Sequence, residues 1–135
     1  MVIPAEFNEV IQRRLTIPLN EGPDKVASLE EALRRLVKPG TLLYLGTAHA
    51  RANALVRELV RQWWGKKPGF TIATVGLGSP WTALILGGLV KRIITTYLGE
   101  GYPYPTPQPL ISKAVLEGKL EVQNWSMLTF PLRLI

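Results

Sequence analysis

The sequence predicts an α/β domain built on an open, mostly parallel sheet with flanking helices. Short β-branched and aromatic runs alternate along the chain with segments whose apolar residues have helical spacing. Such an alternation is typical of parallel strands joined by right-handed crossovers. The chain has 135 residues, of which 47% are hydrophobic and 19% charged, and this fits one globular domain with a core.

The first helix is predicted between Ser28 and Gly40. Ser28 with Glu31 three residues later is a capping box, which satisfies N–H groups of a first helical turn. Pro39 and Gly40 end the segment. Its apolar stripe comprises Leu29, Ala32, Leu33 and Leu36.

A strand over 41–45 leads into a long helix over 50–64. The buried face of that helix is expected to comprise Leu55, Val56, Leu59, Val60 and Trp63. Its solvent face is expected to comprise Arg57, Glu58 and Arg61.

A second strand is predicted over 70–75, followed by a glycine turn over 76–78. Ser79 as N-cap and Pro80 at the first helical position favour a short helix up to about residue 86. The glycine turn resembles a phosphate-binding loop at a helix start, but it lacks the lysine and further glycines of one, so a tight turn is the favoured interpretation.

The third strand is predicted over 93–98, buried beneath helices because it is β-branched and aromatic. Gly87-Gly88 can end the preceding helix, and Lys91-Arg92 are interpreted as a loop. Ligands of open parallel sheets bind beyond the carboxyl ends of strands. A ligand-binding or catalytic site is therefore expected first at Gly99-Glu100-Gly101.

Four alternate prolines over 102–109 predict an extended loop. A helix over 110–117 and a strand over 120–125 follow, and 128–135 is predicted as a fifth strand broken by Pro131. An apolar terminal strand needs a neighbour, so the chain is expected to be truncated or completed by another chain. Residues 1–24 are expected to form an extension, and 25–135 the domain.

The formal net charge of +6 gathers largely between residues 50 and 92 and favours an anionic ligand, although a basic solvated surface explains it equally. No nucleic-acid motif and no membrane-spanning run is recognised. Without a recognisable signal peptide, the expected location is cytoplasmic. The absence of cysteine excludes disulfides and thiolate chemistry, and one histidine cannot build a histidine-rich metal site.

The order of several short motifs makes the chain resemble the alpha (A) subunit of family I CoA-transferases, in particular the glutaconate CoA-transferase type. Compared with that family, the chain is expected to be truncated at its C-terminus. The resemblance runs from about residue 25 to the end of the chain. The segments that carry it are SLEEA (28–32), ALVRELVRQ (54–62), GLVKRII (88–94), YLG (97–99), AVLEGKLEV (114–122) and WS (125–126).

The resemblance implies CoA transfer between an acyl-CoA and a free carboxylate, with coenzyme A handled as substrate. The expected route passes through a glutamyl-CoA thioester. In two-subunit members that glutamate belongs to a partner B-type subunit, and its context matches no glutamate here. The resemblance therefore implies a hetero-oligomer in which this chain holds no catalytic residue and Glu100 at most lines the site.

The family's glycine-rich loop after the first strand corresponds to residues 45–51, where backbone N–H groups can stabilise a developing oxyanion. Thr47 stands where a second glycine is common, and Asn53 replaces a usual proline. The residues expected to bind substrate are Gly46, Thr47, His49, Arg51, Gly76, Gly99 and Glu100. For His49, local capping is the simpler interpretation, and Arg51 is equally compatible with a solvated helix start.

Two other functions remain open from the sequence. The altered Gly46-Thr47 pair and the early end of the chain are compatible with a non-catalytic assembly or regulatory subunit. A sugar-phosphate isomerase-like enzyme would need an acid/base carboxylate near Gly99, and Glu100 is the candidate.

Overall fold

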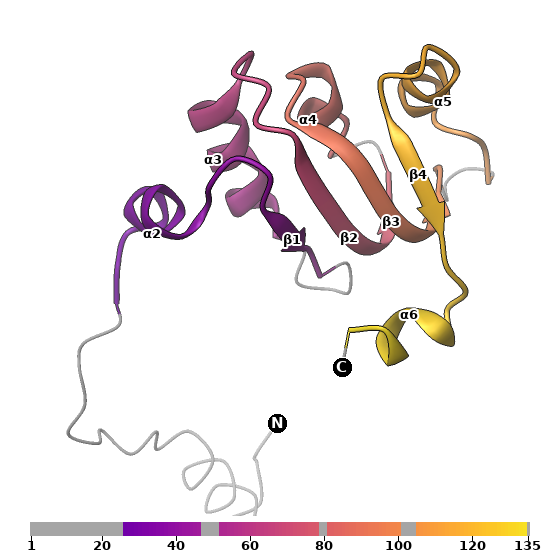
Figure 1. The fold of residues 1–135 in the computed structure, drawn as a ribbon, viewed down its shortest axis with the longest axis horizontal. Helices are drawn as coiled ribbons and strands as arrows, with labels where there is room; N and C mark the ends of the chain where they lie inside the picture. Colours follow the sequence, from indigo (N-terminus) through magenta and orange to yellow (C-terminus); the bar gives the residue numbers. More distant parts are fainter. Residues whose placement is uncertain (1–25, 47–51, 79–80, 101–104, 135) are drawn as a thin grey trace, which may run out of the picture.

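The computed structural model describes residues 26–46, 52–78, 81–100 and 105–134. Its centre is a four-stranded parallel sheet in the order β1-β2-β3-β4 (Figure 1). The strands are β1 (Leu42–Tyr44), β2 (Phe70–Leu77), β3 (Val90–Leu98) and β4 (Glu121–Asn124). The predicted open parallel α/β architecture is thereby confirmed.

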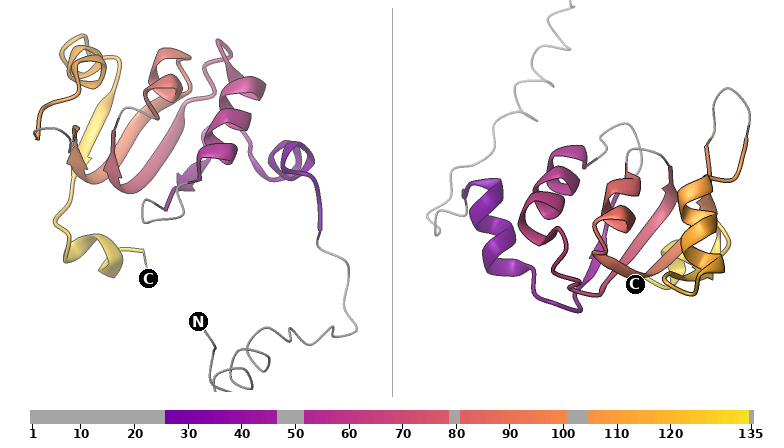
Figure 2. Two further views of the ribbon diagram at one scale, coloured as in Figure 1. Left: turned by 180° about the vertical axis from the view of Figure 1, so that it is seen from behind. Right: turned by 90° about the horizontal axis from the view of Figure 1, so that it is seen from above.

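Helices connect the strands and lie mainly on one side of the sheet (Figure 2). They are α2 (Leu29–Leu36), α3 (Asn53–Trp63), α4 (Thr82–Leu86) and α5 (Pro109–Leu116). Helices α3, α4 and α5 cover this face, while α2 packs beside α3 next to the β1 edge (Figures 1 and 2). A short helix, α6 (Thr129–Leu132), lies on the opposite side of the sheet. Among the described residues, no helix has both the length and the apolar character needed to cross a membrane.

The main hydrophobic core fills the space between the sheet and the helices on its covered face. Its fully buried members include Leu59, Phe70, Ile72, Leu84, Leu89 and Ile93. Phe70 meets Trp63 edge to face, with ring centroids 5.4 Å apart. The buried face predicted for α3 is confirmed, since Val56 and Leu59 are buried in this core and Leu55, Val60 and Trp63 pack against it.

A second, smaller core lies on the opposite face of the sheet. Ala73 and Ile94 from β2 and β3 pack there with Phe130 from α6, which is 1% exposed. The ring of Phe130 lies 5.7 Å from that of Trp125 and 6.2 Å from that of Tyr44, measured between centroids. Phe130 therefore holds the end of the chain against the sheet.

The strand predicted over 128–135 is wrong, because residues 129–132 form α6. The amide of Thr129 donates to the Ser126 hydroxyl (3.0 Å), and the amide of Ser126 donates to the Thr129 hydroxyl (3.1 Å). This reciprocal pair starts a helical turn. Pro131 has no N–H for a strand ladder but fits the first turn of a helix.

Two strands are longer than predicted. β2 continues through Gly76 and Leu77, which pair with Tyr97 and Leu98, so the expected glycine turn is strand up to Leu77. β3 begins at Val90, so the expected Lys91-Arg92 loop is strand as well. Arg92 pairs in register with Glu121 of β4, and its Nε lies 2.9 Å from the carboxylate. Pairing with neighbouring strands overrides the local signals of glycine and charge.

The first helix begins as predicted, with the amide of Glu31 donating to the Ser28 hydroxyl at 3.2 Å. Its predicted apolar stripe is only partly buried: Leu33 is 5% exposed, whereas Leu36 is 77% exposed. Helix α2 packs mainly against α3, and its last turn is exposed at Leu36.

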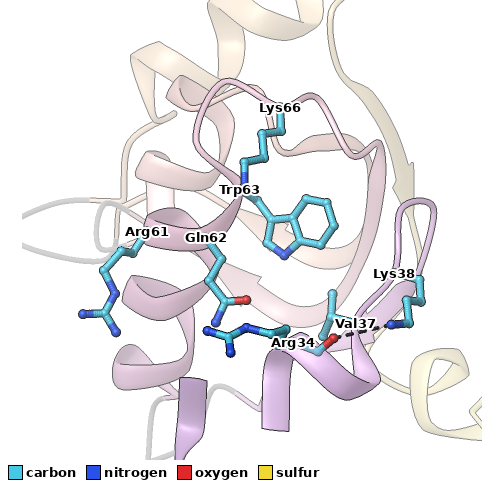
Figure 3. Close-up of a pocket in the computed structure, with 7 residues that line it drawn as sticks. All are labelled: Arg34, Val37, Lys38, Arg61, Gln62, Trp63 and Lys66. Atoms are coloured by element: carbon cyan, nitrogen blue, oxygen red, sulfur yellow. Dashed lines mark hydrogen bonds between the residues drawn. The ribbon is translucent and has the colours of Figure 1, made fainter. Parts of the chain in front are cut away.

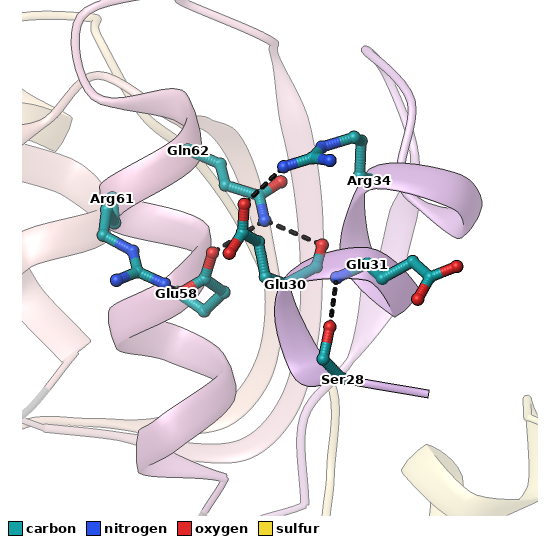
Figure 4. A network of polar contacts seen from close by, with 7 residues as sticks. All are labelled: Ser28, Glu30, Glu31, Arg34, Glu58, Arg61 and Gln62. Atoms are coloured by element: carbon teal, nitrogen blue, oxygen red, sulfur yellow. Dashed lines mark hydrogen bonds and ion pairs between the residues drawn. The ribbon is translucent and has the colours of Figure 1, made fainter. Parts of the chain in front are cut away.

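Glu58, expected on the solvent face, is instead buried, with 7% of its surface exposed. Figure 4 shows the polar network that surrounds it between α2 and α3. The Gln62 amide donates to Glu58 at 2.7 Å and to the backbone oxygen of Glu30 at 3.0 Å, and Arg61 pairs with the Glu58 carboxylate. These contacts hold the pKa of Glu58 below the ordinary value of 4.5, the Gln62 hydrogen bond contributing most, against the opposing effect of burial.

We expect this network to make stability depend on pH in the acid range. Because the pKa of Glu58 is lowered by folding, its contribution is complete above the unfolded-state pKa and disappears as the pH falls through the folded-state value. Glu58→Gln should therefore be less stable than the wild type at pH 7, and the difference should shrink below about pH 4.5. Urea unfolding of both proteins between pH 7 and pH 3 measures this. A difference that stays constant over that range would contradict the expectation.

Candidate functional site

Three neighbouring strands end on the same dipeptide at the carboxyl edge of the sheet. These are Leu45-Gly46 after β1, Leu77-Gly78 at the end of β2 and Leu98-Gly99 at the end of β3. Leu45 and Leu77 are 3% and 2% exposed, so they close the end of the core. Of the three glycines that follow, Gly46 has no described atom within 4 Å of its Cβ position, so its backbone is open to a ligand.

Two buried threonines tie the strand ends together. Thr74 and Thr95 are register partners in β2 and β3, and both are fully buried. The Thr74 hydroxyl donates to the backbone oxygen of Leu45 (2.9 Å), which links the tip of β1 to β2. The Thr95 hydroxyl lies 3.1 Å from the backbone oxygen of Tyr97 in its own strand and 3.3 Å from that of Val75 in β2, within hydrogen-bond reach of both. The strand ends are thus fixed by hydrogen bonds that the apolar pattern alone does not reveal.

The tip of β3 forms a closed corner. Glu100 and Thr106 exchange two backbone hydrogen bonds of 2.9 and 3.1 Å, and the Tyr97 hydroxyl donates to the backbone oxygen of Glu100 at 2.9 Å. Gly99 has φ +155°, and a Cβ on it would lie 2.5 Å from the Thr106 oxygen. Only glycine fits this position without displacement of the backbone.

Gly78 and Glu100 meet at this corner. A Cβ on Gly78 would lie 3.2 Å from the oxygen of Gly99 and 3.5 Å from Oε2 of Glu100. The amide of Gly99 donates to the oxygen of Leu77 (3.2 Å), which joins the ends of β2 and β3. The carboxylate of Glu100 therefore lies beside the backbone of Gly78.

Helices α3 and α4 both begin at the carboxyl edge. The Trp81 indole donates to the Asn53 side-chain oxygen at 3.2 Å, and Trp81 is 3% exposed. This contact fixes the two helix starts relative to each other. The positive end of the α3 dipole lies at this edge, and Ala52 at its start provides no side-chain cap.

The structure places four of the seven residues expected to bind substrate. Gly99 and Glu100 lie together at the tip of β3, as the topology predicted. Gly46 follows β1, and no described atom lies within 4 Å of where its Cβ would be. Gly76 lies within β2, where it pairs with Tyr97 of β3, and not in the connection after the strand. Predictions for Thr47, His49 and Arg51 lie outside the described residues, as do those for Ser79 and Pro80.

Several residues of this edge are not predicted by the sequence pattern. Threonines within apolar strands were a usable signal for Thr74 and Thr95, since a buried hydroxyl needs an acceptor. The Asn53–Trp81 contact joins residues 28 positions apart and left no local signal. Trp81 itself is buried, and Trp63 packs against the core as expected.

Together, the fold and the edge define an open parallel α/β protein whose strand tips and helix starts form one border that carries three glycines. A model of the coenzyme A transferase family matches residues 26–132. The chain belongs to the coenzyme A transferase family. Transfer chemistry on a CoA thioester is the reaction class of that family.

Among solved structures, the chain is similar to a cysteine-to-serine variant of the decarboxylase AibA/AibB. The TM-score is 0.59 and the sequence identity 25%, and the match covers 73% of this chain and 37% of that one. The chain therefore spans little more than a third of that neighbour's length. No curated protein matches this chain by sequence.

Proposed function

We propose that this chain is the A-type subunit of a CoA-transferase that moves CoA between an acyl-CoA and a carboxylic acid. The family match over residues 26–132 is the observation that carries the proposal. A partner B-type subunit supplies the glutamate nucleophile, and the two form a hetero-oligomer. The similar structure carries a two-part name, AibA/AibB, which supports an arrangement of more than one kind of subunit.

The distribution of acidic residues supports a nucleophile on another chain. Five described glutamates lie in α2, in α3, after α5 or in β4, and each of them pairs with an arginine or lysine: Glu30, Glu31, Glu58, Glu117 and Glu121. Among the described residues, Glu100 is the acidic side chain beside the glycine edge. We assign it to the lining of the site, because its corner is closed by Thr106 and Tyr97.

In this proposal the chain provides one wall of the site. Backbone N–H groups at Gly46 and the start of α3 stabilise the negative charge that develops on the thioester oxygen. Gly99 holds the β3 tip in place. The proposal also assigns Thr47, His49 and Arg51 to substrate binding, because the segment that contains them follows Gly46 in the sequence.

The proposal predicts that CoA transfer requires both subunits and an open Gly46. The chain alone should be inactive, and the chain produced together with its B-type partner should exchange CoA between acyl-CoA and a carboxylate. Gly46→Val should lower that exchange about 10- to 100-fold, since an added side chain displaces a substrate from its reactive position. The free energy of unfolding of Gly46→Val should equal that of the wild type, because no described atom lies within 4 Å of the Gly46 Cβ position.

A matched Gly118→Ala variant controls for glycine replacement away from the edge, since Gly118 follows α5 with open space around it. Exchange by the isolated chain would overturn the division between subunits. Unchanged exchange in Gly46→Val would instead favour a non-catalytic assembly or regulatory subunit.

A second candidate is a decarboxylase, favoured by the printed activity of the similar structure. That structure is a variant in which a cysteine is replaced, whereas this chain contains no cysteine and offers no thiol. Release of carbon dioxide from a carboxylated acyl-CoA, without transfer of CoA to an added acid, would identify this activity. A sugar-phosphate isomerase would need Glu100 as its acid or base. Glu100→Gln would therefore abolish isomerase activity.

A further inference from the structure

We infer that a hollow between the ends of α2 and α3 is a binding site for a phosphate ester that carries an apolar or aromatic group. The hollow has a volume of about 420 Å³ and is lined by Arg34, Val37, Lys38, Arg61, Gln62, Trp63 and Lys66. Helices α2 and α3 end where β1 and β2 begin. The hollow therefore lies toward the amino end of the strands, away from the glycine edge, and does not depend on the proposed function.

The charge on this hollow is positive. Four of the seven lining side chains are cationic and none is acidic. Arg34 and Arg61 are paired with Glu30 and Glu58. Among the described ion pairs, neither Lys38 nor Lys66 has a carboxylate partner, so two charges remain for a ligand.

Favourable interaction with a helix dipole explains the position of only two of the four cations. Arg34 and Arg61 lie in the last turns of α2 and α3, where a cation is favourable. Lys38 and Lys66 lie beyond the last residues of those helices, on the connections to β1 and β2. The Lys38 ammonium is 3.4 Å from the oxygen of Arg34, and the Lys66 ammonium is 5.8 Å from the Trp63 ring centroid. Both therefore border the same space.

The floor of the hollow is apolar and includes one unused donor. Figure 3 shows the Trp63 ring between Lys66 and Val37, with its nitrogen facing Arg34 and Val37. Val37 is 4% exposed, and the Trp63 indole nitrogen is buried without a hydrogen-bond partner among the described residues. A buried donor that lacks an acceptor is unfavourable, so a hydrogen bond from this nitrogen to a ligand oxygen would favour binding.

These features select the ligand class. A phosphate monoester carries close to two negative charges at pH 7, which matches the two unpaired lysines. Guanidinium and ammonium groups bind phosphate oxygens by charge-assisted hydrogen bonds. An aromatic or apolar substituent would lie on Trp63 and Val37, as in pockets that combine an apolar floor with a few polar groups.

Phenyl phosphate is a suitable probe, followed through the indole N–H signals of the 15N-labelled chain by NMR. We expect a saturable shift of the Trp63 signal, assigned with Trp63→Phe, and no shift of the Trp81 signal, whose N–H is bonded to Asn53. The double substitution Lys38→Gln with Lys66→Gln should weaken binding about tenfold or more, because two charge-assisted contacts are lost. Lys113→Gln with Lys119→Gln removes the same charge elsewhere and should change binding less than about twofold.

Three results would overturn the inference. The first is the absence of a saturable Trp63 shift. The second is equal weakening by the Lys113 and Lys119 control, which would indicate attraction to overall charge. The third is binding of phenol, or of inorganic phosphate, as tight as that of phenyl phosphate, since the hollow would then recognise only one half of the ligand.

Discussion

Phe70→Ala should lower the free energy of unfolding by about 3–5 kcal/mol, the cost of emptying a large buried site. Phe70 is fully buried at the start of β2, and its amide donates to the oxygen of Leu89 at 2.9 Å. Its ring also meets Trp63 of α3 edge to face. The substitution therefore removes contacts that join the sheet to the helix layer and leaves a cavity that the paired backbone cannot close.

Urea unfolding of Phe70→Ala against the wild type measures this loss. Leu36→Ala is the control, because Leu36 is 77% exposed and its truncation should change stability by less than about 0.5 kcal/mol. A loss below about 1 kcal/mol in Phe70→Ala would show that the residue does not lie in a closed core.

Gly99→Ala should lower the free energy of unfolding by about 2–4 kcal/mol. A Cβ at this position would lie 2.5 Å from the oxygen of Thr106, and φ +155° is a conformation that side chains rarely adopt. The neighbouring backbone cannot move easily, since Glu100 and Thr106 exchange two hydrogen bonds. The corner that places Glu100 beside Gly78 should open as a result.

Gly118→Ala provides the matched control for this effect. Gly118 also has positive φ, at +68°, but nothing lies within 4 Å of its Cβ position. It should therefore show the conformational cost alone, about 1 kcal/mol. Equal losses in Gly99→Ala and Gly118→Ala, measured by thermal unfolding, would mean that the corner at Thr106 is not closed as described.

The sequence predicted the order of strands and helices because their signals are local. The Ser28 cap, the buried face of α3 and the end of α4 at Gly88, which has φ +69°, all rest on short-range spacing and backbone preference. Lys91, Arg92 and Gly76 were misplaced because they lie in strands, where register with neighbours decides. Helix α6 was missed because an apolar segment of eight residues fits a strand or a helix equally.

The candidate site was predicted only in outline. The rule that ligands bind beyond the carboxyl ends of strands correctly placed Gly99 and Glu100 at the edge. The contacts that fix the edge join residues far apart in the chain, such as Thr74 to Leu45 and Trp81 to Asn53. Spacing along one sequence cannot reveal such pairs. The burial of Glu58 has the same origin, because its hydrogen-bond partner Gln62 also donates to the backbone of Glu30 in another helix.

The central claim is that this chain lines a CoA-transferase site whose nucleophile belongs to a partner. The most direct test is intact-mass and peptide mass spectrometry of the two-subunit complex after incubation with acyl-CoA and no acceptor acid. A CoA thioester on a glutamate of the B-type subunit, and none on this chain, is the predicted result. A thioester on this chain, at Glu100 in particular, would contradict it.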